Sequence, residues 1–73
     1  MSKTLIGKEF LEVEWSERRD DGGMFDATVG VARSGDRFVA FVMDGWGGGV
    51  RCTRDTEEAA KGEIDRLWKR LYG

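Results

Sequence analysis

The sequence predicts an α+β domain, in which an antiparallel β-meander of three or four strands is followed by one C-terminal helix packed on one face. Three observations lead to this fold class. Apolar and polar residues alternate early in the chain, glycine and aspartate cluster between the apolar runs, and the last segment has helical spacing. The 73 residues are expected to form one domain, 1–73, with a thin core.

Residues 9–17 and 24–33 are the first two predicted strands. In the first, the apolar residues fall on one face and the polar residues on the other, as expected for a half-buried strand. The apolar set is Leu11, Val13 and Trp15, and the polar set is Glu12, Glu14 and Ser16. The segment Asp20-Asp21-Gly22-Gly23 between the two strands has the composition of a turn.

Residues 37–43, with the sequence RFVAFVM, predict a third strand that is apolar on both faces, and residues 50–53 a short fourth strand. A two-residue turn at 34–36 would place Phe38, Ala40 and Val42 under the helix. A three-residue turn would place Val39, Phe41 and Met43 there instead. We favour the first register, because a small Ala40 suits a helix packed closely above it.

Residues 56–72 predict the helix. Asp55 is the expected N-cap, with Glu58 completing a capping box. Gly62 lies opposite the apolar stripe and should be exposed, at a cost of about 1 kcal/mol relative to alanine. The stripe that packs on the sheet is formed by Ala60, Ile64, Leu67, Trp68 and Leu71.

The third strand leaves one apolar triplet uncovered by the helix, and we expect Phe10 to join it. Such a face indicates a partner, a homodimer, or a cover provided by the chain's own loops. The following loop, DGWGGG, carries Trp46 between glycines. Trp46 either covers its own sheet or anchors a partner, since tryptophan is enriched at interface hot spots.

Catalytic motifs are missing from the sequence. It contains no histidine, and Cys52 is its only cysteine, so the usual triads and zinc sites are excluded. The glycine loop lacks the Gly-Lys-Ser/Thr ending of a phosphate-binding loop. We expect no enzyme activity, no cofactor and no metal. There is no apolar run that predicts a membrane span or a signal peptide, so a cytoplasmic location is expected.

Acidic residues gather in the first part of the chain. Residues 1–26 hold seven acids and four bases, whereas residues 27–54 hold four arginines and two acids. Alternate residues on a strand face are about 6.8 Å apart, comparable to neighbouring phosphates of a nucleic acid. The acids therefore form either a phosphate-like array or an ordinary solvated face. With the apolar anchors, the candidate partner-binding residues are Glu12, Glu14, Glu17, Asp20, Asp21, Asp26, Phe41, Met43 and Trp46.

From Gly30 onward the chain resembles the ethylene-response-factor type of DNA-binding domain, which has a three-stranded sheet and one packed helix. The matching pieces are Gly30-Val31, Phe38-Val39-Ala40, the stretch 55–60, Asp65-Arg66 and Gly73. In that family arginines and tryptophans of the sheet read the major groove. Here the third-strand positions are Val39, Phe41 and Met43, so the resemblance implies the fold and does not favour direct DNA binding.

In type, a small acidic chain with one sheet and one helix also resembles the phage-encoded anti-CRISPR proteins, which inhibit bacterial defence complexes. That resemblance implies a binding protein that blocks a nucleic-acid groove or a protein surface on a bacterial effector complex in the host cytoplasm. The alternative function is a small DNA-binding module using Arg33, Arg37, Arg51 and Arg54. The chain is expected to be a monomer or a homodimer.

Overall fold

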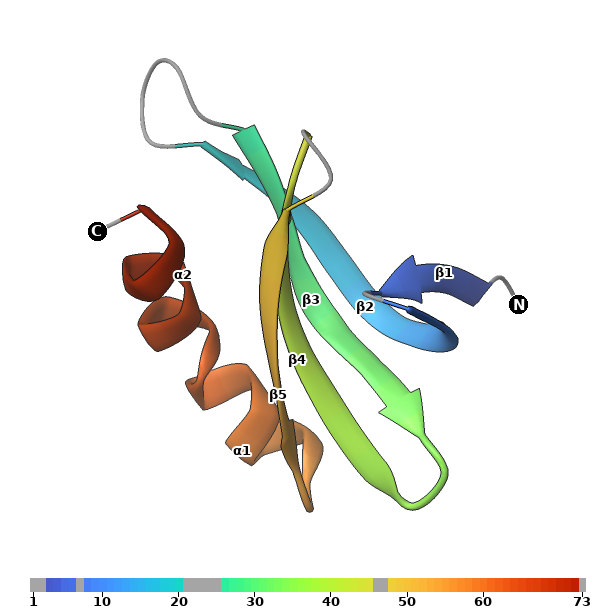
Figure 1. Cartoon of the computed structure of the whole chain (residues 1–73). Helices are drawn as coiled ribbons and strands as arrows, with labels where there is room; N and C mark the ends of the chain where they lie inside the picture. Colours follow the sequence, from blue (N-terminus) through green and yellow to red (C-terminus); the bar gives the residue numbers. More distant parts are fainter. Residues whose placement is uncertain (1–2, 7, 21–25, 46–47, 73) are drawn as a thin grey trace.

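The computed structural model describes residues 3–6, 8–20, 26–45 and 48–72. It contains five strands and a helix in two segments (Figure 1). The α+β class and the C-terminal helix are confirmed, but the predicted number of strands was too small. In chain order the elements are β1 (Lys3–Ile6), β2 (Glu9–Asp20), β3 (Asp26–Ser34), β4 (Arg37–Asp44), β5 (Gly49–Arg54), α1 (Glu57–Gly62) and α2 (Ile64–Tyr72).

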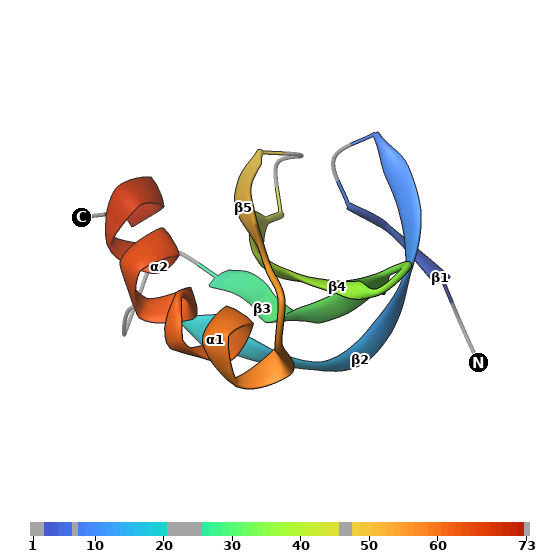
Figure 2. The same cartoon turned by 90° about the horizontal axis from the view of Figure 1, so that it is seen from below.

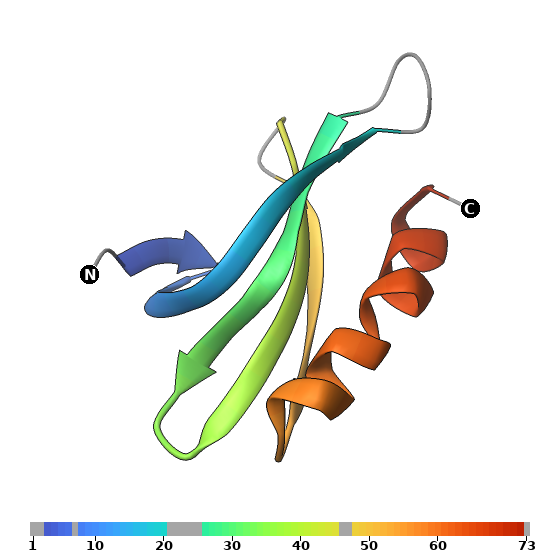
Figure 3. The ribbon, with the colours of Figure 1, turned by 180° about the vertical axis from the view of Figure 1, so that it is seen from behind.

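The five strands form one sheet in the order β1-β2-β3-β4-β5, with every neighbouring pair antiparallel. β1 was missed because a strand of four residues is too short to show an alternating pattern. The sheet is strongly curved, and α1 and α2 lie outside the curve (Figure 2). β1 and the helices therefore lie on opposite sides of the molecule, as the view from behind also shows (Figure 3).

The turn between β3 and β4 has the predicted two-residue loop, because Ser34 pairs with Arg37. Gly35 has a φ of 63°, and no residue other than glycine has a positive φ in the described chain. A single positive φ at the first turn position is what a type II′ turn requires. This register places Val29, Val31, Ala40 and Val42 on the side of the helix, as predicted.

The helix side of the sheet holds the larger apolar cluster. Ala60, Ile64 and Leu67 of the helix are buried against β3 and β4, and Trp68 and Leu71 pack at the border of the cluster. The predicted helical stripe is therefore confirmed. Gly62 is exposed, as predicted, and a Cβ at this position would meet no atom within 4 Å.

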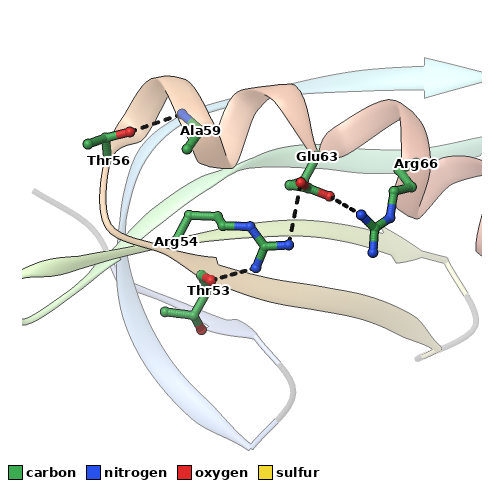
Figure 4. Close-up of polar contacts among 6 residues, drawn as sticks. All are labelled: Thr53, Arg54, Thr56, Ala59, Glu63 and Arg66. Carbon is green, nitrogen blue, oxygen red and sulfur yellow. Dashed lines mark hydrogen bonds and ion pairs between the residues drawn. The ribbon is translucent and has the colours of Figure 1, made fainter.

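Two details of the helix differ from the prediction. The N-cap is Thr56, whose hydroxyl accepts a hydrogen bond from the Ala59 N–H at 3.1 Å, whereas Asp55 lies 3.7 Å from Arg37. The helix is interrupted at Glu63, between α1 and α2. The Glu63 carboxylate lies 3.4 Å from Arg54 and 3.3 Å from Arg66, so it links β5 to α2 at the bend (Figure 4).

The inner, concave side of the sheet holds a second apolar cluster of Ile6, Leu11, Ala32, Val39 and Phe41. The helix leaves this face uncovered, as predicted, but Val39 and Phe41 are only 3% and 1% exposed, so the chain itself covers them. The β1–β2 hairpin curls over this face and places Ile6 and Leu11 on it. The cover of this face therefore comes from the β1–β2 hairpin, and its first strand was not among the predicted strands.

A β-bulge at Glu14 explains how β2 contributes apolar side chains to both sides of the sheet. Val13 pairs with Ala32 and Trp15 pairs with Val31, so Glu14 is the extra residue. Before the bulge, Leu11 and Val13 pack in the inner cluster; after it, Trp15 packs in the helix-side cluster. The prediction that Leu11, Val13 and Trp15 share one face was therefore wrong.

Candidate protein-interaction surface

Leu5 and Phe10 form an exposed apolar pair on the β1–β2 hairpin. They are cross-strand partners, and they are 49% and 67% exposed. Their neighbours Ile6 and Leu11 point into the inner cluster, so the alternation of side chains directs Leu5 and Phe10 to the outer side. The helices pack near the other end of β2, where Arg19 lies 2.9 Å from Asp65, and they lie away from β1 (Figure 1).

Charged residues of both signs border this pair. Glu12 pairs across the strands with Lys3 on one side and with Arg33 on the other. Together with Phe10, these residues line a shallow hollow of about 480 Å³ that extends to the β3–β4 turn, where Arg33 Nε donates a hydrogen bond to the Gly35 carbonyl at 3.3 Å. An aromatic residue surrounded by a charged rim is typical of a protein-interaction surface. We call Lys3, Leu5, Phe10, Glu12 and Arg33 the hairpin patch.

The predicted acidic residues do not form one array. Glu12 lies between two bases, and Glu14 is exposed at the bulge. Glu17 lies 3.8 Å from Arg19. The bulge also interrupts the regular alternation along β2 at Glu14, so Glu12 and Glu14 are not successive positions of one regular strand face.

At the far end of β2, Asp20 pairs across the strands with Asp26. The Asp26 carboxylate forms an ion pair and a hydrogen bond with Arg18, and these interactions raise the pKa of Arg18. Asp21 lies outside the described residues. Among its described residues, this end of the hairpin therefore carries charges of both signs.

The predicted apolar anchors also fall in different places. Phe41 is buried against Gly30, so its ring is not available to a partner. Met43 is half-buried and lines a pocket on the concave side. Trp46 lies outside the described residues, so its two predicted roles stay predictions. Phe10 is exposed, but on the outer side and not on the concave face where it was expected.

Two hydrogen bonds between Asp44 and Gly48 close the base of the glycine loop. The Asp44 N–H donates to the Gly48 carbonyl at 2.9 Å, and the Gly48 N–H donates to Asp44 Oδ1 at 2.7 Å. A Cβ at Gly48 would lie 2.8 Å from the Asp44 carboxylate, and a Cβ at Gly49 would lie 2.8 Å from the Val42 carbonyl. The contact at Gly49 is with backbone, so a side chain there would require a strand to shift, whereas the Asp44 side chain could move away from a Cβ at position 48.

Most arginines of the described chain are paired with acids of the same chain. Arg51 lies 3.1 Å from Glu9, Arg54 lies 3.4 Å from Glu63, and Arg37 lies 3.7 Å from Asp55. Three of the four arginines proposed for DNA binding therefore have an internal carboxylate within 4 Å. A nucleic acid would have to compete with these carboxylates for each contact.

Cys52 packs at the border of the helix-side cluster. Burial raises the pKa of the Cys52 thiol, and Arg54 opposes this effect. A raised pKa lowers the fraction of thiolate, so Cys52 has the character of a structural residue and not of a nucleophile.

Among the residues that the structure describes, no group of acidic or cysteine side chains is placed to hold a metal ion. Over the same part of the chain, no helix is long and apolar enough to cross a membrane.

In the part of the chain that the structure describes, fold and surface together define a small five-stranded α+β domain with an exposed apolar pair bordered by charges. Comparison with protein-family models, with curated proteins and with solved structures found no match.

Sequence reasoning missed Lys3 and Leu5 because it missed β1. The available signal was the apolar pair Leu5-Ile6, followed after two residues by the alternation of β2. A two-residue connection between such segments is typical of a hairpin. That signal would have placed Leu5 beside Phe10.

Proposed function

We propose that this chain is a small non-enzymatic binding protein whose hairpin patch contacts a partner protein. The observation that carries the proposal is the exposure of Phe10 and Leu5 side by side, because a large aromatic residue left two-thirds in water is a candidate hot spot. The mixed charges of Lys3, Glu12 and Arg33 would form a polar rim around this anchor.

Within this proposal, the partner is a bacterial nucleic-acid-handling defence complex, and the chain inhibits it by occupying a protein surface. The resemblance in type to anti-CRISPR proteins supports this choice of partner. The alternating signs around Phe10 favour a protein surface over a uniformly basic groove, which would require a continuous acidic array.

The alternative of a DNA-binding module receives less support from the arrangement of the arginines. A salt titration against duplex DNA tests it directly. Micromolar binding that weakens steeply with salt would favour the DNA-binding alternative, whereas no binding at about 50 mM salt would exclude it.

The test of the main proposal uses purified RNA-guided effector complexes and their target duplexes in gel-shift assays. We expect about one equivalent of the protein to prevent DNA binding by one of these complexes. Phe10→Ala should weaken inhibition by roughly tenfold or more, as for a hot-spot aromatic. Because Phe10 is mostly exposed, this change should alter the free energy of unfolding by no more than about 0.5 kcal/mol.

The matched control is Glu58→Ala, which changes an exposed residue of α1 on the other side of the molecule. This control should inhibit as well as the parent. If no complex is inhibited, the proposed target is wrong. If Phe10→Ala and the control inhibit equally well, the hairpin patch is not the contact surface.

A further inference from the structure

The second half of β2 forms an open edge of the sheet. β1 pairs only with Glu9–Glu12, so it lies beside the first part of β2 alone (Figure 3). From Trp15 to Asp20, β2 pairs with β3 on one side, and no other strand of the described chain pairs with it on the opposite side. An edge of this kind presents backbone N–H and C=O groups to a further strand. We call Trp15–Asp20 the β2 edge.

The side chains of the β2 edge alternate between the two faces of the sheet. Trp15 packs in the helix-side cluster, so Glu17 and Arg19 point to the helix side as well. Arg19 Nη1 lies 2.9 Å from Asp65 Oδ1, and the guanidinium carbon lies 5.5 Å from the centre of the Trp68 ring. Contacts with α2 therefore fix the position of Arg19 on this side of the strand.

The charges of the β2 edge are available to a second strand. The side chains of Glu17 and Arg18 are 57% and 78% exposed. Glu17 Oε1 lies 3.8 Å from Arg19 Nη2, which is too far for a hydrogen bond, so this carboxylate can accept further donors. The guanidinium of Arg19 has five N–H donors and can bind a second carboxylate besides that of Asp65.

The order of these charges is complementary to itself. When two copies of the β2 edge pair antiparallel about a two-fold axis at Arg18, Glu17 of each copy lies opposite Arg19 of the other. Residues directly opposite each other in an antiparallel pair point to the same face, so the carboxylate and the guanidinium meet. Opposite charges in this position stabilise the pairing of the strands.

Other registers are less favourable. An axis at Glu17 places the two copies of Glu17 opposite each other, and like charges in that position are destabilising. An axis at Arg19 pairs fewer residues of the edge and separates Glu17 from Arg19 of the other copy. The axis at Arg18 places two arginines opposite each other, but each of them forms an ion pair with Asp26 of its own chain. The order of charges therefore favours the axis at Arg18.

We infer that the β2 edge binds the β2 edge of a second copy of this chain, so that the two sheets join into one continuous antiparallel sheet. The charges select this partner, because a strand that lacks a base opposite Glu17 and an acid opposite Arg19 gains less from the pairing. The inference does not depend on the proposed function, since the hairpin patch consists of other residues.

Sedimentation velocity measures the oligomeric state of the parent protein. Over concentrations from about 10 µM to about 1 mM, we expect a reversible dimer with a dissociation constant of roughly 0.1 mM, as for a small interface. In an NMR dilution series, the amide resonances of Ser16–Arg19 should shift with concentration. Those of Gly49–Arg54 in β5, the other long edge strand of the described chain, should not shift.

Charge reversal tests the register. Glu17→Lys places a base opposite Arg19, and Arg19→Glu places an acid opposite Glu17, so each variant alone should dimerise roughly tenfold more weakly than the parent or worse. An equimolar mixture of the two variants restores both pairs of opposite charge, and it should dimerise within about threefold of the parent. The matched control is Glu58→Lys, which makes the same change of charge at an exposed position of α1 and should dimerise as the parent does.

The inference is overturned if the parent stays monomeric at the highest concentration, or if the concentration-dependent shifts lie in β5 or the hairpin patch. It is also overturned if Glu17→Lys and Glu58→Lys dimerise equally well, or if the mixture of folded variants does not dimerise. Should Arg19→Glu fail to fold because it loses Asp65, the comparison of Glu17→Lys with Glu58→Lys still decides. Phe10→Ala should dimerise as the parent does, so loss of inhibition and loss of dimerisation are separate outcomes.

Discussion

Replacement of Gly30 by alanine should destabilise the protein strongly, although the change adds one methyl group. Gly30 lies in the middle of β3, opposite Ser16 on one side and Phe41 on the other. A Cβ there would lie 2.4 Å from the Trp15 carbonyl oxygen, 2.8 Å from Phe41 Cζ and 3.0 Å from Ser16 Cα. Two of these atoms are backbone atoms just after the bulge, so they can move away only if β2 shifts.

The expected magnitude follows from two opposing effects. Overpacking of a close contact costs about 1–3 kcal/mol, and the higher strand propensity of alanine returns less than 1 kcal/mol. Since the closest contact is with backbone, we expect a net loss of about 2 kcal/mol in the free energy of unfolding. For a domain of this size, that loss corresponds to a decrease of roughly 8–16 °C in Tm.

The assay is chemical denaturation followed by tryptophan fluorescence and by circular dichroism, with thermal melts in parallel. The matched control is the same substitution at Gly62, where a Cβ would meet open space. Gly62→Ala should stabilise the protein by about 0.5–1 kcal/mol, because alanine is the better helix former. A neutral or stabilising effect of Gly30→Ala would refute the reasoning, since it would mean that β2 and β3 do not approach as closely as described.

Three further predictions concern named side chains. Phe41→Ala should lower the free energy of unfolding by about 3–5 kcal/mol, measured by thermal or chemical denaturation, because the ring is buried. A loss as small as that expected for Phe10→Ala would contradict the burial of Phe41 in the inner cluster. Thr56→Ala should lower the free energy of unfolding by about 1 kcal/mol, because it removes the N-cap of α1. If the same measurement shows no change, the cap does not contribute to stability. Because burial raises the pKa of the Cys52 thiol, the folded state holds this proton more tightly. Its contribution to the free energy of unfolding is therefore complete below the unfolded pKa near 9.0 and is lost as the pH rises through the higher folded pKa. Above the unfolded pKa, the free energy of unfolding of the parent should fall more steeply with pH than that of Cys52→Ala. Parallel pH dependences of the two proteins would contradict this.

Much of the fold followed from local sequence patterns. The turn at Ser34-Gly35-Asp36 and the apolar residues on either side of it fixed the β3–β4 register, because a two-residue hairpin loop allows only one pairing. The helical stripe from Ala60 to Leu71 was equally readable, since its spacing matches only a helix packed on one side. Residues that lie close together in the sequence determine these features, so the sequence pattern is enough to predict them.

The candidate site was less readable because it depends on long-range geometry. Nothing in the sequence marks Glu14 as a bulge, as there is no glycine or proline at or beside it. Without the bulge, Phe10 was expected on the concave face and Glu12 beside Glu14 in a regular row. The pairing of Arg18 with Asp26, and of Arg51 with Glu9, likewise appears only when distant strands are brought together. Those pairings changed an apparently acidic hairpin into a surface of mixed charge.

The bulge at Glu14 has a consequence for how this chain tolerates change. Glu14 is exposed, so a substitution there alters little that the core depends on. Deletion of the same residue would shift the register of β2 by one residue. Every side chain on one side of the deletion would then point to the opposite face of the sheet. Either Trp15 would lose its place in the helix-side cluster, or Leu11 and Val13 would lose their packing in the inner cluster with Phe41. The residue type at position 14 can therefore vary, whereas the number of residues in β2 cannot. A library that varies only residue types would report position 14 as dispensable.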